Sequence, residues 1–68
     1  MNKFAERIRE LRLESSMSRA TLSKRINVSE RLISYWENGK RECDFDMLLR
    51  LSELFSVSVD YLLGRSDF

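Results

Sequence analysis

Residues 17–41 read MSRATLSKRINVSERLISYWENGKR. Ser18 is a good N-cap for a helix that runs up to Asn27, a residue type that tolerates the left-handed conformation found just after a helix. Ser29 is a second N-cap, and the helix that it begins ends at Asn38-Gly39, where Gly39 suits the same conformation. The stretch therefore predicts two short helices joined by a turn of about three residues, which together form a rigid corner.

The second helix of this corner has two different sides. Helical spacing places four polar side chains on one side, namely Glu30, Arg31, Ser34 and Tyr35. Ile33 and Trp36 fall on the opposite side, and Trp36 fits a place in the core better than a base-stacking role. A helix that reads base edges in the major groove of DNA needs this division, because its polar side must be exposed while its other side is fixed to a scaffold.

The sequence on either side of the corner predicts three more helices. They span about 3–14, 45–55 and 59–63. Apolar residues are so frequent in the second of these that it is expected to be the central helix of the fold. Asp44 and Ser58 are suitable N-caps for the last two helices, and Gly64 ends the fifth. We therefore expect an all-α, compact bundle of five short helices in one domain over 1–68, with the helix-turn-helix at about 18–38.

The composition argues against several kinds of site. The chain has 68 residues, one cysteine and no histidine, so neither an internal disulfide nor a metal site is expected. It has no long apolar run, which argues against a membrane span or a signal peptide and makes the cytoplasm the expected compartment. No reactive-cysteine context or Gly-rich phosphate loop is visible, so neither an enzyme nor a cofactor-binding protein is indicated. Cys43 is expected to be a spectator, although the nearby Lys40 and Arg41 leave a redox-sensing role open.

Charge is distributed unevenly along the chain, although the net charge is only +1. Residues 1–41 carry ten Lys or Arg and five Asp or Glu, a net charge of +5. Residues 42–68 carry two Lys or Arg and six Asp or Glu, a net charge of −4. One part of the molecule can therefore meet phosphates while the other stays away from them, unless the uneven scatter is accidental.

The stretch at 17–41 resembles the helix-turn-helix of phage repressor and Cro-type (XRE-like) regulators. The segment I-S-x-W-E-N-G-K at 33–40 is a quite specific signal for this family. FAERIRELR at 4–12 and LLRLSELFSVSVDYLLG at 48–64 extend the resemblance over nearly the whole chain. The resemblance implies a lambda-repressor-like bundle whose second helix lies across the DNA backbone and whose third enters the major groove. It also implies a bacterial or phage-encoded protein.

The resemblance and the chemistry of the side chains suggest how this chain would contact double-stranded DNA. Arg favours the O6 and N7 atoms of guanine and Glu accepts from the amino group of cytosine, so Arg31 and Glu30 are candidates for base contacts, with a local surface pair as the alternative. Ser34 and Tyr35 complete the candidate base contacts, and Tyr35 could instead hold a phosphate. The phosphate candidates, which could otherwise form a solvated rim, are Ser18, Arg19, Asn38, Lys40 and Arg41.

Two positions near the corner stand out. Arg19 occupies a place where the family usually has a Gln that helps to clamp a phosphate, and an Arg could make that contact through two parallel hydrogen bonds. Glu37 lies at the C-terminal end of the third helix, where a negative charge opposes the helix dipole. The resemblance assigns Arg12 as its partner in a partly buried ion pair, and the alternative is an exposed Glu37 tolerated at small cost.

Two functions remain open on the sequence. The first is a sequence-specific transcriptional regulator, a repressor that binds a two-fold symmetric operator as a homodimer, because one short helix covers too few base pairs. Dimer contacts would come from the acidic, apolar C-terminal part, with four candidates: Tyr61, Leu62, Leu63 and Phe68. The second is a module that binds a protein partner of the antitoxin or anti-repressor kind. A module of that kind should lose the basic rim that this chain keeps.

Overall fold

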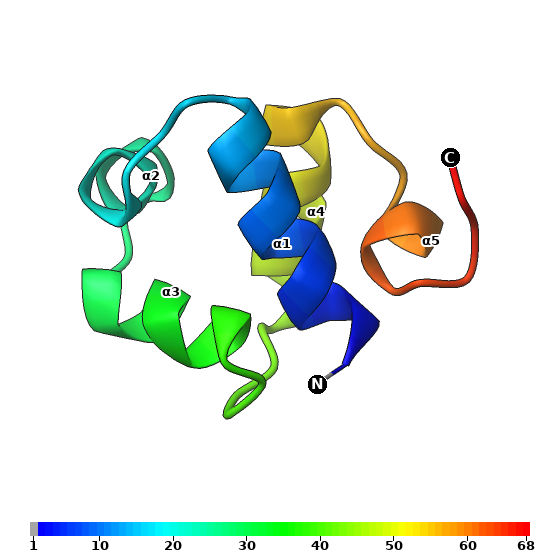
Figure 1. Ribbon diagram of the computed structural model, residues 1–68, viewed down its shortest axis with the longest axis horizontal. Coiled ribbons are helices and arrows are strands. Elements are labelled where there is room, and N and C mark those ends of the chain that lie inside the picture. The colour runs from blue at the N-terminus through cyan, green and yellow to red at the C-terminus, as the bar shows by residue number, and fades with distance from the viewer. Residues whose placement is uncertain (1) are drawn as a thin grey trace.

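The computed structural model describes residues 2–68, and this part of the chain forms five helices and no strand (Figure 1). The helices are α1 (Lys3–Glu14), α2 (Arg19–Ile26), α3 (Glu30–Glu37), α4 (Phe45–Phe55) and α5 (Val59–Leu62). The expected all-α bundle is confirmed, and the helix boundaries agree with the sequence to within about one residue. Within residues 2–68, no helix is both long and apolar enough to cross a membrane.

Every helix begins with a side chain that caps it. The cap oxygen accepts a hydrogen bond from the backbone N–H three residues further on, which satisfies one of the donors that a helix start leaves unpaired. The donor–acceptor distances are 2.7 Å for Asn2, 3.0 Å for Ser18, 3.0 Å for Ser29, 2.8 Å for Asp44 and 2.9 Å for Ser58. Four of these caps follow from the sequence pattern, and the cap at Asn2 adds a fifth.

Several helices are followed by a residue in the left-handed backbone conformation. Asn27 (φ 59°), Gly39 (φ 73°) and Gly64 (φ 79°) adopt the conformation that the sequence predicts for them. Ser16 (φ 57°) and Ser56 (φ 54°) adopt it as well, although serine has no particular tolerance for it. Steric crowding also requires a glycine at position 64, because a Cβ atom there would collide with the side chain of Lys3. The end of α5 therefore lies directly against the first turn of α1.

The core lies between α1 and the helices around it. In Figure 1, α1 crosses the middle of the molecule, with α2 and α3 on one side and α5 on the other. Trp36 is 1% exposed, and its ring meets that of Phe4 edge to face, with 6.2 Å between the ring centroids. Trp36 is therefore a core residue, as expected. The other buried apolar side chains are Ala5, Ile8, Leu11, Leu22, Ile26, Ile33, Leu48, Leu51 and Leu62.

Two expectations about apolar residues are wrong. The apolar α4 is not surrounded by the rest of the fold as a central helix would be, since Phe45 is 85% exposed and Leu49 is 53% exposed. A helix that is apolar around most of its circumference can bury only the stripe that faces its neighbours, and in α4 this stripe includes Leu48 and Leu51. Leu62 is 0% exposed and belongs to the core, so it cannot contribute to a dimer surface.

Candidate nucleic-acid interface

The corner between α2 and α3 is fixed from within. Leu22 of α2 and Ile33 of α3 are both fully buried in the shared core. In the turn, the backbone N–H of Val28 donates to the carbonyl oxygen of Ser23 at 3.0 Å, and the left-handed Asn27 reverses the chain. The orientation of α3 relative to α2 is therefore set by packing and by backbone hydrogen bonds.

The polar side of α3 faces outward, opposite its buried side. Glu30 and Arg31 are exposed, and Ser34 and Tyr35 are half-buried at the same surface. A shallow hollow on this side is lined by Ser29, Arg31, Leu32, Tyr35 and Arg41. The hollow brings Arg31 and Tyr35, two candidates for base contacts, together with Arg41, a candidate for phosphate contact. The division of α3 into two sides is as the sequence predicts.

A basic rim follows α3 in the chain. Lys40 and Arg41 are exposed, and their backbone N–H groups donate to the carbonyl oxygen of Tyr35 at 2.9 and 3.3 Å. These bonds fold the segment back along the end of α3. The guanidinium of Arg41 lies 5.4 Å from the centre of the Tyr35 ring, a cation–π distance. Asn38 is exposed beside them, and its Nδ2 donates to Ser34 Oγ at 3.3 Å.

The start of α2 carries two further phosphate candidates. Ser18 is exposed, and its hydroxyl accepts from the backbone N–H of Thr21 and donates to the Thr21 hydroxyl at 3.1 Å. Arg19 is the first residue of α2, and its side chain is 41% exposed. The candidate phosphate contacts thus lie at two places, the start of α2 and the segment after α3.

Glu37 binds two arginines. Arg12 donates from Nε to Glu37 Oε2 at 2.7 Å and from Nη2 to Oε1 at 3.1 Å. Arg19 donates from Nε and Nη2 to Glu37 Oε1 at 3.2 and 3.1 Å. The Glu37 side chain is 0% exposed and that of Arg12 is 10% exposed, so the expected pairing with Arg12 is present but is more deeply buried than expected. The bonds from Arg19 were not expected.

The two arginines explain how a carboxylate is tolerated at this place. A negative charge at the C-terminal end of α3 opposes the helix dipole, and burial adds a desolvation cost. Four N–H donors from Arg12 and Arg19 offset both costs at Glu37. Arg12 also donates from Nη1 to the carbonyl oxygen of Met17 at 3.0 Å. The cluster therefore joins α1, α2 and α3, and we call these three side chains the Arg12–Glu37–Arg19 cluster.

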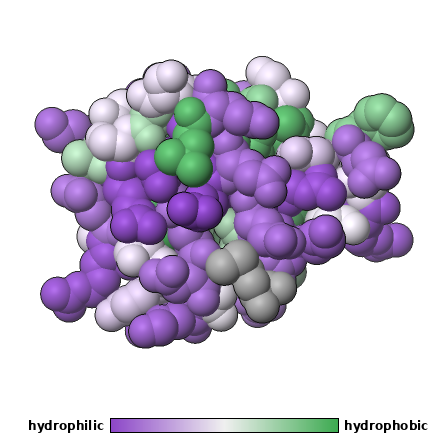
Figure 2. All heavy atoms as spheres, in the orientation of Figure 1, coloured by the Kyte–Doolittle hydropathy of each residue, from purple (hydrophilic) through white to green (hydrophobic). Residues whose placement is uncertain are grey.

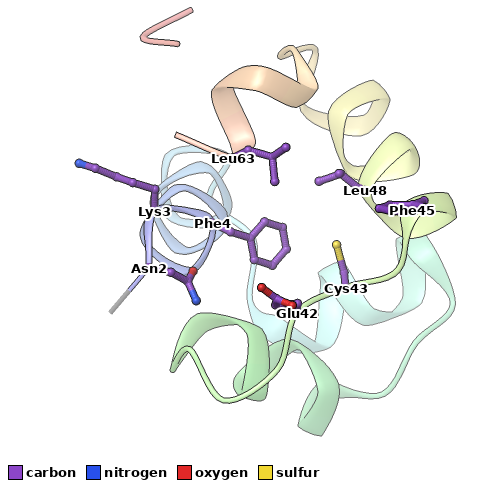
Figure 3. A pocket seen from close by; sticks show the side chains of 8 residues that line it. All are labelled: Asn2, Lys3, Phe4, Glu42, Cys43, Phe45, Leu48 and Leu63. Carbon is purple, nitrogen blue, oxygen red and sulfur yellow. The ribbon is translucent and has the colours of Figure 1, made fainter. Parts of the chain in front are cut away.

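A second hollow is lined by residues outside α2 and α3. It has a volume of about 290 Å³ and is lined by Asn2, Lys3, Phe4, Glu42, Cys43, Phe45, Leu48 and Leu63. Figure 3 shows Phe4 of α1, Leu48 of α4 and Leu63, the residue after α5, pointing into it, while Lys3 points away. Burial and the neighbouring Asp44 carboxylate raise the pKa of the Cys43 thiol to about 11, so this thiol stays protonated at neutral pH. The structure therefore offers no activation for a redox role of Cys43.

The sequence matches the family described as Helix-turn-helix over residues 8–62. The chain belongs to the helix-turn-helix family. The matched range contains the α2–α3 corner, the Arg12–Glu37–Arg19 cluster and most of the core. The resemblance of the sequence to XRE-like regulators is thereby confirmed.

Several relatives of this helix-turn-helix chain are known regulators. It is 34% identical over 64 residues to the HTH-type transcriptional regulator ImmR of Bacillus subtilis (strain 168), covering 94% of this chain and 50% of that protein. It is 41% identical over 60 residues to Repressor protein C2 of Salmonella phage P22, covering 88% of this chain and 28% of that protein. The chain thus spans about half the length of ImmR and a smaller part of the phage repressor.

Solved helix-turn-helix structures share the whole fold. The P22 c2 repressor, solved in complex with synthetic operator 9T, superposes with a TM-score of 0.87 at 36% identity. The match covers 97% of this chain and 100% of that one. A transcriptional regulator from Listeria innocua superposes with a TM-score of 0.87 at 30% identity, covering 94% of this chain and 60% of that chain.

Proposed function

We propose that this chain is the DNA-binding part of a transcriptional regulator, a repressor that reads its operator with α3. The observation that carries the proposal is the two-sided α3, which is anchored by the buried Ile33 and Trp36 and presents exposed polar side chains beside a basic rim. Support comes from the P22 c2 repressor, which has the same fold and was solved with a synthetic operator. The function requires binding only, with no chemical step and no cofactor.

Each side chain on the outward surface has a proposed role. Arg31 would donate to the O6 and N7 atoms of a guanine, and Glu30 would accept from the amino group of a cytosine. Ser34 and Tyr35 would complete the base contacts on the side where the hollow lies. The phosphate contacts, which fix the register of the protein on the duplex without reading sequence, are proposed for Ser18, Arg19, Asn38, Lys40 and Arg41.

A homodimer would supply the specificity that one α3 lacks. Two copies of α3 about 34–36 Å apart would read two half-sites in successive turns of the major groove. The proposed dimer surface is the C-terminal part, where Leu63 is 46% and Phe68 is 89% exposed and Tyr61 is half-buried. Such a protein would act in the cytoplasm of a bacterium, encoded by the bacterium or by a phage.

Selection of binding sites from random duplex DNA tests this proposal. The purified chain is expected to enrich a two-fold symmetric consensus whose half-sites are one helical turn apart. Binding to that consensus, followed by fluorescence anisotropy, should exceed binding to a scrambled duplex at least about a thousandfold. If no sequence is enriched, the proposal is overturned and a protein-binding module becomes the better candidate, since the strongly exposed Phe45 offers an apolar contact for a partner.

A further inference from the structure

The Glu37 carboxylate is the buried centre of a cluster that is exposed to solvent mainly through Arg19. Glu37 is 0% exposed and Arg12 is 10% exposed, whereas Arg19 is 41% exposed. Among residues 2–68, Arg12 and Arg19 are the basic side chains that bind this carboxylate, and their two charges exceed its single charge by one. The excess positive charge of the cluster is therefore presented to solvent by Arg19.

The way Glu37 binds Arg19 leaves half of that guanidinium free. A guanidinium carries five N–H bonds in one plane, and they form two edges that can each bind an oxyanion. Glu37 takes the edge formed by Nε and Nη2, with distances of 3.2 and 3.1 Å to Oε1. The other edge, formed by Nη1 and the second hydrogen of Nη2, has no hydrogen-bond partner within residues 2–68. The Glu37 carboxylate, which binds the opposite edge, fixes the plane of the Arg19 guanidinium.

We propose that Glu37 is a positioning residue for DNA binding, which holds Arg19 by one edge so that the other edge meets a phosphate oxygen. This inference rests on the proposed function. Arg19 begins α2 and Glu37 ends α3, so the cluster links a phosphate contact at the start of one helix to the orientation of the helix that reads the bases. A pre-oriented Arg19 also loses less side-chain freedom on binding than a free one would.

Lysine at position 19 separates positioning from charge. A lysine keeps the positive charge but is a point donor without two edges, so it cannot bind Glu37 and a phosphate in the same fixed arrangement. We expect Arg19→Lys to bind a duplex carrying the selected operator about tenfold more weakly than the wild type, with an unchanged dependence on salt concentration. Arg19→Ala should bind as weakly or more weakly, and its salt slope should become shallower by about one. Arg50→Lys, an exposed arginine of α4, is the matched control and should bind like the wild type.

The role of Glu37 is tested by combining substitutions. If Glu37 acts on DNA through Arg19, Glu37→Gln should weaken binding of the folded protein, and the Arg19→Ala/Glu37→Gln double variant should bind no more weakly than Arg19→Ala. Circular dichroism identifies a temperature at which every variant is folded, and DNA binding is measured at that temperature. In the DNA-free wild type, NMR should show an Arg19 Nε proton that exchanges slowly with water, and Glu37→Gln should abolish this protection.

The affinities of these variants can overturn the inference. If Arg19→Lys equals the wild type in affinity, charge alone suffices. If the losses from Arg19→Ala and Glu37→Gln multiply in the double variant, the two residues act separately. If Glu37→Gln does not fold, the inference is tested by the affinity of Arg19→Lys and by the exchange rate of the Arg19 Nε proton in the wild type. Fast exchange of that proton would overturn it. If the wild-type chain binds no duplex, the proposed function fails as well. If it binds the operator but the variants do not behave as expected, only the positioning role of Glu37 fails.

Discussion

At the scale of single residues, Arg31 is the best-placed side chain for reading a base. It lies in the first turn of α3, is exposed and borders the hollow on the outward side. We expect Arg31→Ala to weaken binding to the selected operator by about 1–3 kcal/mol and to relax the preference at one base position. Titration of a panel of operator variants by fluorescence anisotropy measures both effects.

Lys40 serves as the contrasting control for Arg31. It is exposed in the segment that follows α3, where the proposed contacts are to the DNA backbone. Lys40→Ala should weaken binding to all duplexes alike, with a salt slope shallower by about one. If Arg31→Ala also weakens operator and random duplexes equally, Arg31 contacts phosphate and does not read a base.

Glu37 offers a test of stability that needs no DNA. Glu37→Gln removes the charge that Arg12 and Arg19 share and leaves the buried Arg12 guanidinium without a counter-charge. Breaking a buried pair costs about 3–5 kcal/mol, and because Arg19 can turn toward water the expected loss is near the lower end of that range. Thermal unfolding measures it, with Glu10→Gln at an exposed position of α1 as the control. Unfolding curves that coincide for the two variants would mean that the cluster contributes little to stability.

The contacts of Glu37 also show how far the residues of the site could be predicted. The unfavourable place of its charge at a helix end indicated that a cation was needed, and the family resemblance supplied Arg12. The bonds from Arg19 could not be predicted in this way. They join two helices across 18 positions of the chain, so they depend on the angle at which α2 packs against α3.

At the scale of helices, the starts were easier to predict than some of the ends. Each start is decided by one polar side chain and the N–H group three residues later, which is a local signal. Ends at Asn27, Gly39 and Gly64 carry residue types that favour a left-handed conformation. Ser56 carries no such signal, yet it is left-handed because the chain must turn sharply between α4 and α5.

A substitution at Ser56 is therefore expected to increase the stability of the fold. At φ 54° and ψ 43°, any side chain with a Cβ atom is strained, and glycine is not. We expect Ser56→Gly to raise the free energy of unfolding by about 0.5–1 kcal/mol, after allowance for the greater freedom of glycine in the unfolded chain. Urea denaturation measures the change. Ser52→Gly, inside α4, is the control and should lower stability; a loss in both variants would contradict the strain at Ser56.

The orientation of α4 could not be predicted from its own residues. Its apolar side chains surround most of the helix, so the sequence alone does not indicate which stripe is buried. The arrangement of α1 and α5 decides this, and it leaves Phe45 and Leu49 exposed. Hydrophobic periodicity thus predicted that α4 exists, whereas the choice of the stripe that it buries follows from tertiary packing.

At the scale of the whole molecule, the surface divides into regions with different chemistry. Figure 2 shows a face that is mostly hydrophilic, with separate apolar groups at its surface. Leu63 is one of the exposed apolar side chains, at the end of α5, and it borders the hollow of Figure 3. It is therefore the clearest place at which to test the proposed dimer.

Leu63→Asp should weaken a dimer without disturbing the core, because Leu63 is 46% exposed whereas its neighbour Leu62 is buried. We expect binding to the two-fold operator to fall at least about tenfold, while binding to an isolated half-site stays the same. Analytical ultracentrifugation with and without operator DNA measures the assembly. Leu13→Asp, at an exposed leucine of α1, is the matched control. Equal losses on the full operator and the half-site would place Leu63 outside the dimer surface.

The five N-caps have a consequence for the rate at which the molecule folds. Each cap is satisfied by a backbone group only three residues away, so each helix start can form before distant parts of the chain have met. Small helical proteins whose contacts are mostly local fold within microseconds to milliseconds. A molecule of this kind that unfolds by chance returns to its native state quickly, and its exposure to proteases during each such excursion is correspondingly brief.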